Sequence, residues 1–212
     1  MGMKFEHLVG AVIHDLKNQL QALLDYEQEA IARIPKRYHN HLLPILLRTS
    51  RLKNDTMQMV SLFRLEHKSH FPMDDAWPKD TVADAIEATS SQYPTIRFVN
   101  NIGDDCQGFY NEELINLALV TLITNCAQAG ATEITLSADD SEGLTIRIED
   151  NGHGFDDDVL SGQRETTKEE GTGLGLYFVQ LIAEHHNQGE LLGRVDISNR
   201  PRGGACVCLF LP

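Results

Sequence analysis

Asp150, Gly152 and Gly154 have the residue types and the spacing of a nucleotide-binding loop. They follow directly on an expected strand over residues 144–150. A carboxylate at a strand end can accept a hydrogen bond from the amino group of adenine, and guanine offers no donor at that place. The two glycines allow the backbone to turn sharply and to approach a flat base. Because Asp-Asn-Gly is also a common turn signal, the loop alone fits both a pocket and an ordinary turn.

A second glycine cluster, Gly171, Gly173 and Gly175, opens an expected helix. Exposed backbone amides at a helix start favour phosphate. The cluster is neither a Walker loop nor a dinucleotide-binding fingerprint, since position 176 is Leu. Its place after the first glycine pair is therefore the stronger indication of a nucleotide pocket.

The segment between the two glycine clusters, residues 155–170, is polar and lacks periodicity. It predicts a mobile lid over the nucleotide, or a solvated loop, or both. Arg164 and Lys168 are its only cations, so they are its candidates for contact with phosphate.

Asn125 lies late in an expected helix over residues 111–129, beside the apolar stripe of that helix. Its amide oxygen is a hard ligand of the kind that Mg²⁺ takes together with phosphate oxygens. A polar residue near the end of a helix is an equally good explanation of Asn125 taken alone.

His14 lies about 150° from the centre of the apolar stripe of an expected helix over residues 4–34. Asn18 shares its side of the helix. Asp15 can hold one ring nitrogen protonated, which makes the other nitrogen a better nucleophile. A lone exposed histidine is usually a solvated surface residue. With a nucleotide pocket in the same chain, however, His14 becomes a candidate acceptor for phosphoryl transfer.

Two long helices, over residues 4–34 and 39–67, are expected to form a hairpin that turns at Pro35. Pro44 stands near the start of the second helix, so regular helix could begin there. A hairpin of this kind has too little partner surface to bury its apolar stripe, which predicts a homodimeric four-helix bundle.

The proline-containing segment 69–78 predicts a domain boundary. Residues 1–70 are expected to form the dimerisation and histidine phosphotransfer hairpin, and residues 71–212 the catalytic ATP-binding domain. In the second part, helices and strands alternate irregularly, which predicts an α+β fold with helices on one face of a mixed sheet. The expected helices cover 80–92, 111–129 and 173–186, and the expected strands 95–100, 133–138, 144–150, 191–198 and 205–211.

Composition narrows the possible partners and compartments. The formal net charge of −13 argues against binding to nucleic acid or to an anionic membrane surface. No apolar run approaches the ~18 residues of a membrane span, so a soluble, cytoplasmic protein is expected. Cys106, Cys126, Cys206 and Cys208 have no metal-binding spacing and are expected to be reduced core residues, with the last two on one side of a strand.

Four motifs, in the family's order, resemble those of the sensor histidine kinases of two-component systems. His14–Leu20 resembles the phosphoacceptor box, Leu122–Gln128 the Asn box, and Asp150–Gly154 and Gly171–Leu176 the two glycine boxes. Gly203–Pro212 resembles the closing strand. The resemblance covers nearly the whole chain.

The resemblance implies a dimeric helical hairpin followed by an ATP-binding domain of the Bergerat type, an α/β sandwich. It implies a catalytic role for His14, Asp15 and Asn18. It also implies ATP and Mg²⁺ as ligands, with Asn125 on the metal. The residues expected to bind the nucleotide are Asn125, Asp150, Gly152, Gly154, Gly171, Gly173 and Gly175.

The boxes also depart from the family pattern. Gln19 replaces the usual proline after the His box, Thr121 the usual first asparagine of the Asn box, and Gln128 the usual lysine. The changes in the Asn box remove one side chain that could contact the metal and one cation that could contact the phosphates. Asp15 fits both the Asp-x-x-Asn and the Asp-x-x-x-Gln patterns, which in the family are tied to phosphatase activity.

The resulting hypothesis is a histidine kinase that phosphorylates His14 from ATP and passes the phosphoryl group to a response-regulator aspartate, with phosphatase activity on the same partner as a further function. A separate sensor protein is another candidate partner. The alternative is a phosphotransfer relay protein with a degenerate, non-catalytic nucleotide pocket.

Overall fold

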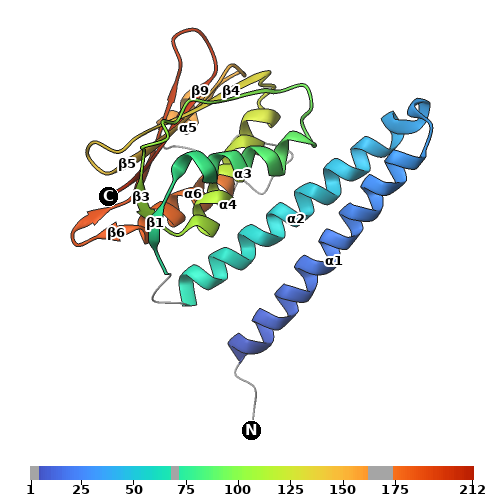
Figure 1. Ribbon diagram of the computed structural model, residues 1–212, viewed down its shortest axis with the longest axis horizontal. Coiled ribbons are helices and arrows are strands. Elements are labelled where there is room, and N and C mark those ends of the chain that lie inside the picture. The colour runs from blue at the N-terminus through green and yellow to red at the C-terminus, as the bar shows by residue number, and fades with distance from the viewer. Residues whose placement is uncertain (1–4, 68–71, 162–173) are drawn as a thin grey trace. The chain divides into compact units, whose positions relative to one another are not determined.

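The computed structural model describes residues 5–67, 72–161 and 174–212 and divides into two compact units, residues 1–63 and 64–212 (Figure 1). Within the described ranges, none of the helices combines the length and the hydropathy that a membrane crossing requires.

The first unit is built from two long helices, α1 (Phe5–Arg33) and α2 (His39–His67), joined by Pro35 and the short 3-10 helix η1 (Lys36–Tyr38). The predicted hairpin helices are therefore confirmed. The expectation that regular helix begins at Pro44 is wrong, because α2 already begins at His39. The N–H that Pro44 lacks would bond a carbonyl in the first turn of α2, so its absence removes a single bond of the helix ladder.

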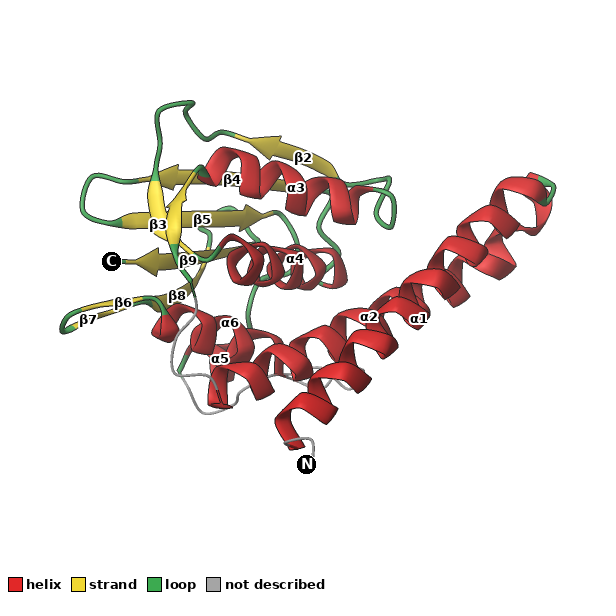
Figure 2. Cartoon of the chain, turned by 60° about the horizontal axis from the view of Figure 1, so that its bottom comes forward, coloured by secondary structure: helices red, strands yellow, loops and turns green. Residues whose placement is uncertain are grey.

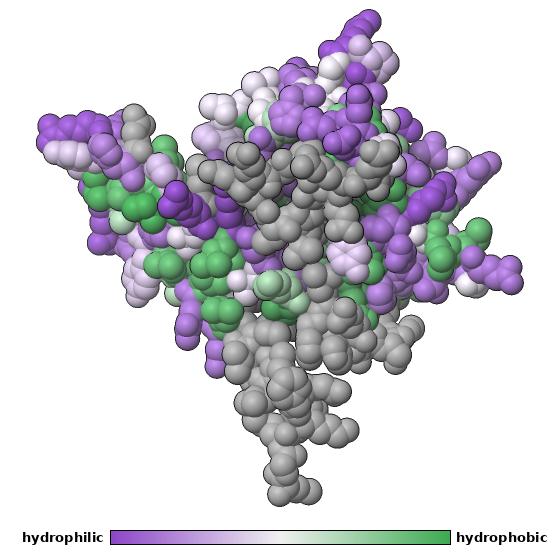
Figure 3. All heavy atoms as spheres, turned by 180° about the vertical axis from the view of Figure 1, so that it is seen from behind, coloured by the Kyte–Doolittle hydropathy of each residue, from purple (hydrophilic) through white to green (hydrophobic). Residues whose placement is uncertain are grey.

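Side chains tie α1 to α2 along the hairpin. Thr49 donates to Glu27 Oε1 at 2.8 Å, and Lys53 Nζ donates to Gln21 Oε1 at 2.6 Å. Leu20 and Leu24 of α1 are buried, but other large apolar side chains of the hairpin are exposed, and Figure 3 shows such hydrophobic patches among hydrophilic side chains. These exposed residues are Leu16, Leu23, Tyr26, Tyr38, Leu43, Ile45, Leu52 and Met59.

The second unit contains, within the described residues, a five-stranded sheet of order β2-β4-β5-β9-β8. Its strands are β2 (Arg97–Asn100), β4 (Glu133–Asp139), β5 (Leu144–Asp150), β8 (Arg194–Asn199) and β9 (Ala205–Leu211). β2 and β4 run parallel, and the other neighbours run antiparallel. The sheet is thus mixed, as predicted.

Three helices cover one face of this sheet, as Figure 2 shows: α3 (Pro78–Ser90), α4 (Glu112–Gln128) and α6 (Leu174–His185). Alternate strand residues, such as Ile146 and Leu209, are fully buried. Alternation of this kind is what a sheet with one covered face requires. The α+β fold class is confirmed.

The predicted strand over residues 191–198 is in fact two strands. β7 (Leu191–Leu192) pairs with β6 (Asn187–Gln188), and β8 begins after Gly193. The break has a physical cause: Gly193 N–H donates to His186 O at 3.0 Å, and a Cβ on Gly193 would lie 2.0 Å from Ala183 O. The chain is pinned there to the end of α6.

A small antiparallel sheet of β1 (Asp74–Ala76) with β3 (Gly108–Tyr110) is a feature that the sequence pattern did not predict. Three residues are too few to display an alternation of apolar and polar side chains.

The four cysteines are all free, as expected. Cys206 and Cys208 extend from the same side of β9, with their sulfur atoms 3.9 Å apart. Burial raises the pKa of Cys208, and the neighbouring Cys206 adds to that effect.

Candidate functional site

Asp150 ends β5 as a carboxylate that is only 2% exposed. Its Oδ1 accepts hydrogen bonds from the backbone N–H of Gly152 at 2.7 Å and of Ala205 at 3.3 Å. Two amide donors offset part of the cost of burying a charge. Because both bonds go to Oδ1, Oδ2 takes part in neither and is the oxygen that a ligand's amino group could approach.

Gly152 and Gly154 stand where the backbone packs too closely for a side chain. A Cβ on Gly152 would lie 2.6 Å from Ala129 O, at the end of α4. Gly154 has φ +79, and a Cβ there would lie 2.6 Å from Asn199 Oδ1. Neither position therefore has room for a side chain, and Gly154 also has the left-handed backbone that glycine favours.

The same loop is anchored to β4 by Asn151. The Asn151 Oδ1 accepts from Thr132 N at 2.8 Å and Glu133 N at 2.9 Å, and its Nδ2 donates to Thr132 Oγ1. Asn151 thus has a local structural task that the motif alone did not reveal.

Asn125 is half-buried on α4, against the start of α6. A Cβ on Gly175 would lie 3.2 Å from Asn125 Nδ2 and 3.3 Å from Thr121 Cγ2. The structure therefore brings Asn125 next to the last glycine of the second cluster. Gly171 and Gly173 lie outside the described residues.

The donor set around Asn125 limits the kind of metal site that fits. The described residues contain no group of three histidine, cysteine or carboxylate side chains that could hold a metal ion. Mg²⁺ commonly keeps several waters and binds through few protein oxygens plus substrate phosphates. A single amide oxygen from Asn125 is compatible with that mode of binding.

The expected lid, residues 155–170, is folded at its beginning. Residues Asp157–Leu160 form the short helix α5, and Val159 is buried. These residues are therefore not a solvated irregular loop, because they form a helix with a buried apolar side chain, whereas the mobility of the lid stays a prediction. The rest of the segment, with Arg164 and Lys168, lies outside the described residues.

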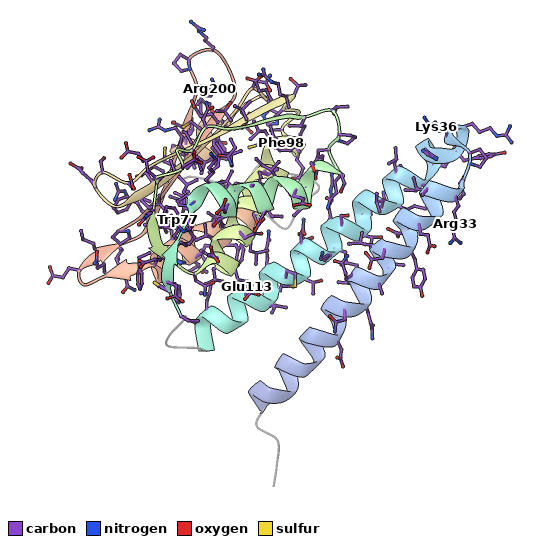
Figure 4. All side chains as sticks on the ribbon, in the orientation of Figure 1. Arg33, Lys36, Trp77, Phe98, Glu113 and Arg200 are labelled. Carbon is purple, nitrogen blue, oxygen red and sulfur yellow. The ribbon has the colours of Figure 1, made fainter. Side chains whose placement is uncertain are left out.

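The turn between β8 and β9 holds the Asp150 loop through contacts that sequence reasoning missed. Asn199 and Arg200 bond the loop, and Gly204 packs against the backbone of Asp150. Figure 4 labels Arg200 at this turn. The sequence signal that could have found it is the run of turn-forming residues Arg200-Pro-Arg-Gly-Gly204.

The phosphoacceptor box lies on α1, in the other unit. Asp15 and Asn18 are exposed, and for Asn18 this agrees with the side of the helix that the helical period predicted. Gln21 and Asp25 continue the polar side and bond each other at 2.8 Å. His14 is part of α1, but its side chain lies outside the described part of the structure.

Comparison with known proteins gives one family and several relatives. Residues 110–212 match the family "Histidine kinase-, DNA gyrase B-, and HSP90-like ATPase". The tetrathionate sensor histidine kinase TtrS of Salmonella typhimurium is 27% identical over 88% of this chain and 33% of its own length. The signal transduction histidine-protein kinase AtoS of Escherichia coli is 27% identical over 97% of this chain and 34% of its own length.

Solved structures agree with the fold. The ATP-binding domain of PrrB from Mycobacterium tuberculosis is 28% identical, with a TM-score of 0.55, over 67% of this chain and 98% of that one. The histidine kinase AdeS of Acinetobacter baumannii, at 19% identity and a TM-score of 0.59 over 93% of this chain and 97% of that one, shares the fold.

This chain spans about a third of the length of TtrS and AtoS. The predicted resemblance is nevertheless confirmed: residues 110–212 match the model of the histidine kinase-, DNA gyrase B- and HSP90-like ATPases, and the chain is similar to two-component sensor histidine kinases.

Proposed function

We propose that this chain is an ATP-dependent protein-histidine kinase that phosphorylates its own His14 and passes the phosphoryl group to an aspartate of a response-regulator receiver domain. The observation that carries the proposal is the Asp150 carboxylate. It is buried at a strand end, held by two backbone amides, and lies in a region that matches an ATPase family.

On the side of the phosphoryl donor, ATP, Asp150 would accept a hydrogen bond from the amino group of adenine. The backbone amides of the glycines before α6 would bind the phosphates. Asn125 would hold Mg²⁺, which neutralises phosphate charge when bound. The contribution of the protein is to position the nucleotide and to select adenine.

On the acceptor side, one ring nitrogen of His14 would attack the γ-phosphorus, so that a P–N bond forms as the bond to the ADP oxygen breaks. Asp15 would keep the proton on the other ring nitrogen, and Asn18 would orient the phosphoryl group or a water. In the second transfer, a receiver aspartate oxygen bonds phosphorus as the P–N bond breaks.

The same exposed residues, Asp15 with Asn18 or Gln19, are the candidates for hydrolysis of the phosphorylated partner. A homodimer formed by the hairpins would cover the exposed apolar side chains of α1 and α2.

Labelling with γ-labelled ATP tests the proposal directly. Parent protein is expected to incorporate label, and His14→Ala to incorporate none, because the acceptor nitrogen is gone. His41→Ala, on the exposed surface of α2, is the matched control and should label as the parent does. Equal labelling of parent and His14→Ala would exclude His14 as the acceptor.

A second candidate function is a phosphotransfer relay that no longer uses ATP. Thr121 favours it, because this residue stands where the family has an asparagine, and its hydroxyl donates to Leu117 O within α4 at 2.8 Å. A magnesium-dependent rise in melting temperature on addition of ATP distinguishes the two functions. A kinase shows it, and a relay with a degenerate pocket does not.

A further inference from the structure

Arg200 reaches from the β8–β9 turn to the last two residues of β5. Its Nη1 donates to the backbone O of Asp150 at 2.8 Å, and its Nε lies 3.3 Å from Glu149 Oε1. Both charged side chains are about one-third exposed, at 35% for Arg200 and 30% for Glu149. A guanidinium is a rigid, planar fork, so contacts to two successive residues fix both the position and the direction of the strand end.

Asn199 fixes the next part of the loop. Its Oδ1 accepts from Phe155 N at 2.7 Å, and its Nδ2 donates to Phe155 O at 2.8 Å. The side-chain amide thus satisfies both backbone groups of Phe155, as a neighbouring strand would do. Arg200 and Asn199 therefore hold the two ends of the segment 150–155.

The turn also approaches the loop with its own backbone. Gly204 has φ +92, and a Cβ there would lie 1.9 Å from Asp150 O. The following residue, Ala205, is the one whose N–H donates to Asp150 Oδ1. Asp150, the residue that is proposed to bind adenine, is therefore held from the β8–β9 turn at two places. Arg200 bonds its backbone carbonyl, and Ala205 bonds its side-chain carboxylate.

We propose that Asn199 and Arg200 are positioning residues that set the geometry of Asp150 and so determine how strongly the pocket prefers a nucleotide base with an amino group over one without it. The inference rests on the proposed function, since it takes Asp150 as the adenine-reading residue. Hydrogen bonds depend steeply on distance and angle, so a small displacement of the carboxylate weakens that one contact and spares the phosphate contacts.

The test compares ATP with ITP, which has the same phosphates and sugar but lacks the 6-amino group. Binding of each nucleotide with magnesium is measured by calorimetry. The parent is expected to bind ATP roughly tenfold to a hundredfold more tightly than ITP, since a hydrogen bond to a charged group is lost in ITP. In Arg200→Ala this ratio should fall several-fold, through weaker ATP binding with ITP binding unchanged.

Graded variants separate positioning from a merely structural role. Arg200→Lys keeps the charge but not the fork, so its ratio should lie between those of parent and Arg200→Ala. Asn199→Asp retains the acceptor for Phe155 N and loses the donor to Phe155 O, and is also expected to be intermediate. Arg202→Ala, an exposed arginine of the same turn, is the control and should keep the parent ratio.

Each other outcome overturns the proposal in a recognisable way. If ATP and ITP weaken equally in Arg200→Ala and Asn199→Asp, the turn only supports folding. If the parent binds ATP and ITP equally, Asp150 does not read adenine. If the parent binds neither nucleotide, the proposed kinase function itself fails. An unchanged ratio in all variants, with the parent selective, refutes the positioning role alone.

Discussion

The proposed phosphoryl-acceptor site and the proposed adenine pocket differ in how they are built: the first lies on the surface of one helix, and the second is buried and held by several elements. The acceptor box lies on consecutive turns of one helix, and its Asp15 and Asn18 are exposed. Asp150 is 2% exposed, and two of its partners come from much later in the chain. Ala205, 55 positions later, bonds its side chain, and Arg200, 50 positions later, bonds its backbone carbonyl.

The difference follows from what each part must do. A residue that receives a phosphoryl group from one partner and gives it to another has to be accessible, and a surface helix provides that. A carboxylate that distinguishes one base from another works best where water cannot compete, and burial requires partners from several elements. Changes in one part should therefore leave the other intact.

The largest expected effect lies at the turn that holds Asp150. Gly203 and Gly204 have nearly the same φ, +91 and +92, but a Cβ on Gly203 meets nothing within 4 Å, whereas one on Gly204 would lie 1.9 Å from Asp150 O. Gly203→Ala is expected to cost about 1–2 kcal/mol of unfolding free energy from backbone strain alone. Gly204→Ala should cost at least about 3 kcal/mol.

Urea denaturation monitored by circular dichroism measures both variants against the parent. The Gly203→Ala variant controls for the left-handed backbone, so the difference between the two isolates the close approach to β5. Equal losses in the two variants would show that the contact with Asp150 carries no additional free energy.

Asp150→Asn tests the pocket without touching the hairpin. An asparagine can keep its Oδ1 as the acceptor for both backbone amides, but its NH₂ group would then face the adenine amino group, donor against donor. ATP binding is expected to weaken roughly tenfold to a hundredfold. The exposed Glu142→Gln is a charge-matched control. Calorimetry gives the affinity and analytical ultracentrifugation the oligomeric state, which should equal that of the parent.

Leu23→Ser tests the hairpin without changing the nucleotide pocket. Leu23 is 46% exposed on α1 in the single chain, so its burial in a dimer would contribute, for each chain, roughly half of the ~1.5–3 kcal/mol of a fully buried leucine. The substitution should weaken dimerisation roughly tenfold or more and leave ATP affinity unchanged. Ala22→Ser, at the exposed neighbouring position, introduces the same serine without removing a large apolar side chain and is the control. Unaltered sedimentation of Leu23→Ser would remove that side chain from the dimer interface.

The same contrast explains which features could be read from the sequence. The helices of the hairpin and the strand Leu144–Asp150 follow from local periodicity. Asn111, a residue type favoured at helix starts, caps α4 by accepting from Leu114 N at 2.9 Å. Local patterns of this kind carry their own structural information.

Contacts that depend on how the strands are ordered and aligned in the sheet could not be predicted from local sequence patterns. The bond from Arg200 to Asp150 arises because β5, β9 and β8 lie side by side, which no local pattern encodes. The short helix α5, the strand β6 and the separation of β7 from β8 were not predicted for a related reason: elements of two to four residues have no measurable period.

His186 extends the comparison to a second histidine, one that is buried rather than placed on a surface helix. It is 2% exposed, Nδ1–H donates to Ile182 O at 2.7 Å, and Nε2 accepts from Asn111 N at 3.1 Å. These two bonds fit only the neutral ring. Burial lowers the pKa of His186 from its ordinary value of 6.5, with the proximity of His185 acting in the same direction.

A lowered pKa in the folded state means that the unfolded chain binds the proton more readily. Stability should therefore fall as the pH drops below about 6.5, and the loss should continue down to the folded-state pKa. In parallel melts at about pH 8 and pH 5.5, His186→Gln is expected to lose less melting temperature between the two conditions than the parent, because glutamine does not titrate. His185→Gln should retain most of the parent's pH dependence. An identical pH dependence in parent and His186→Gln would mean that this buried ring does not couple protonation to folding.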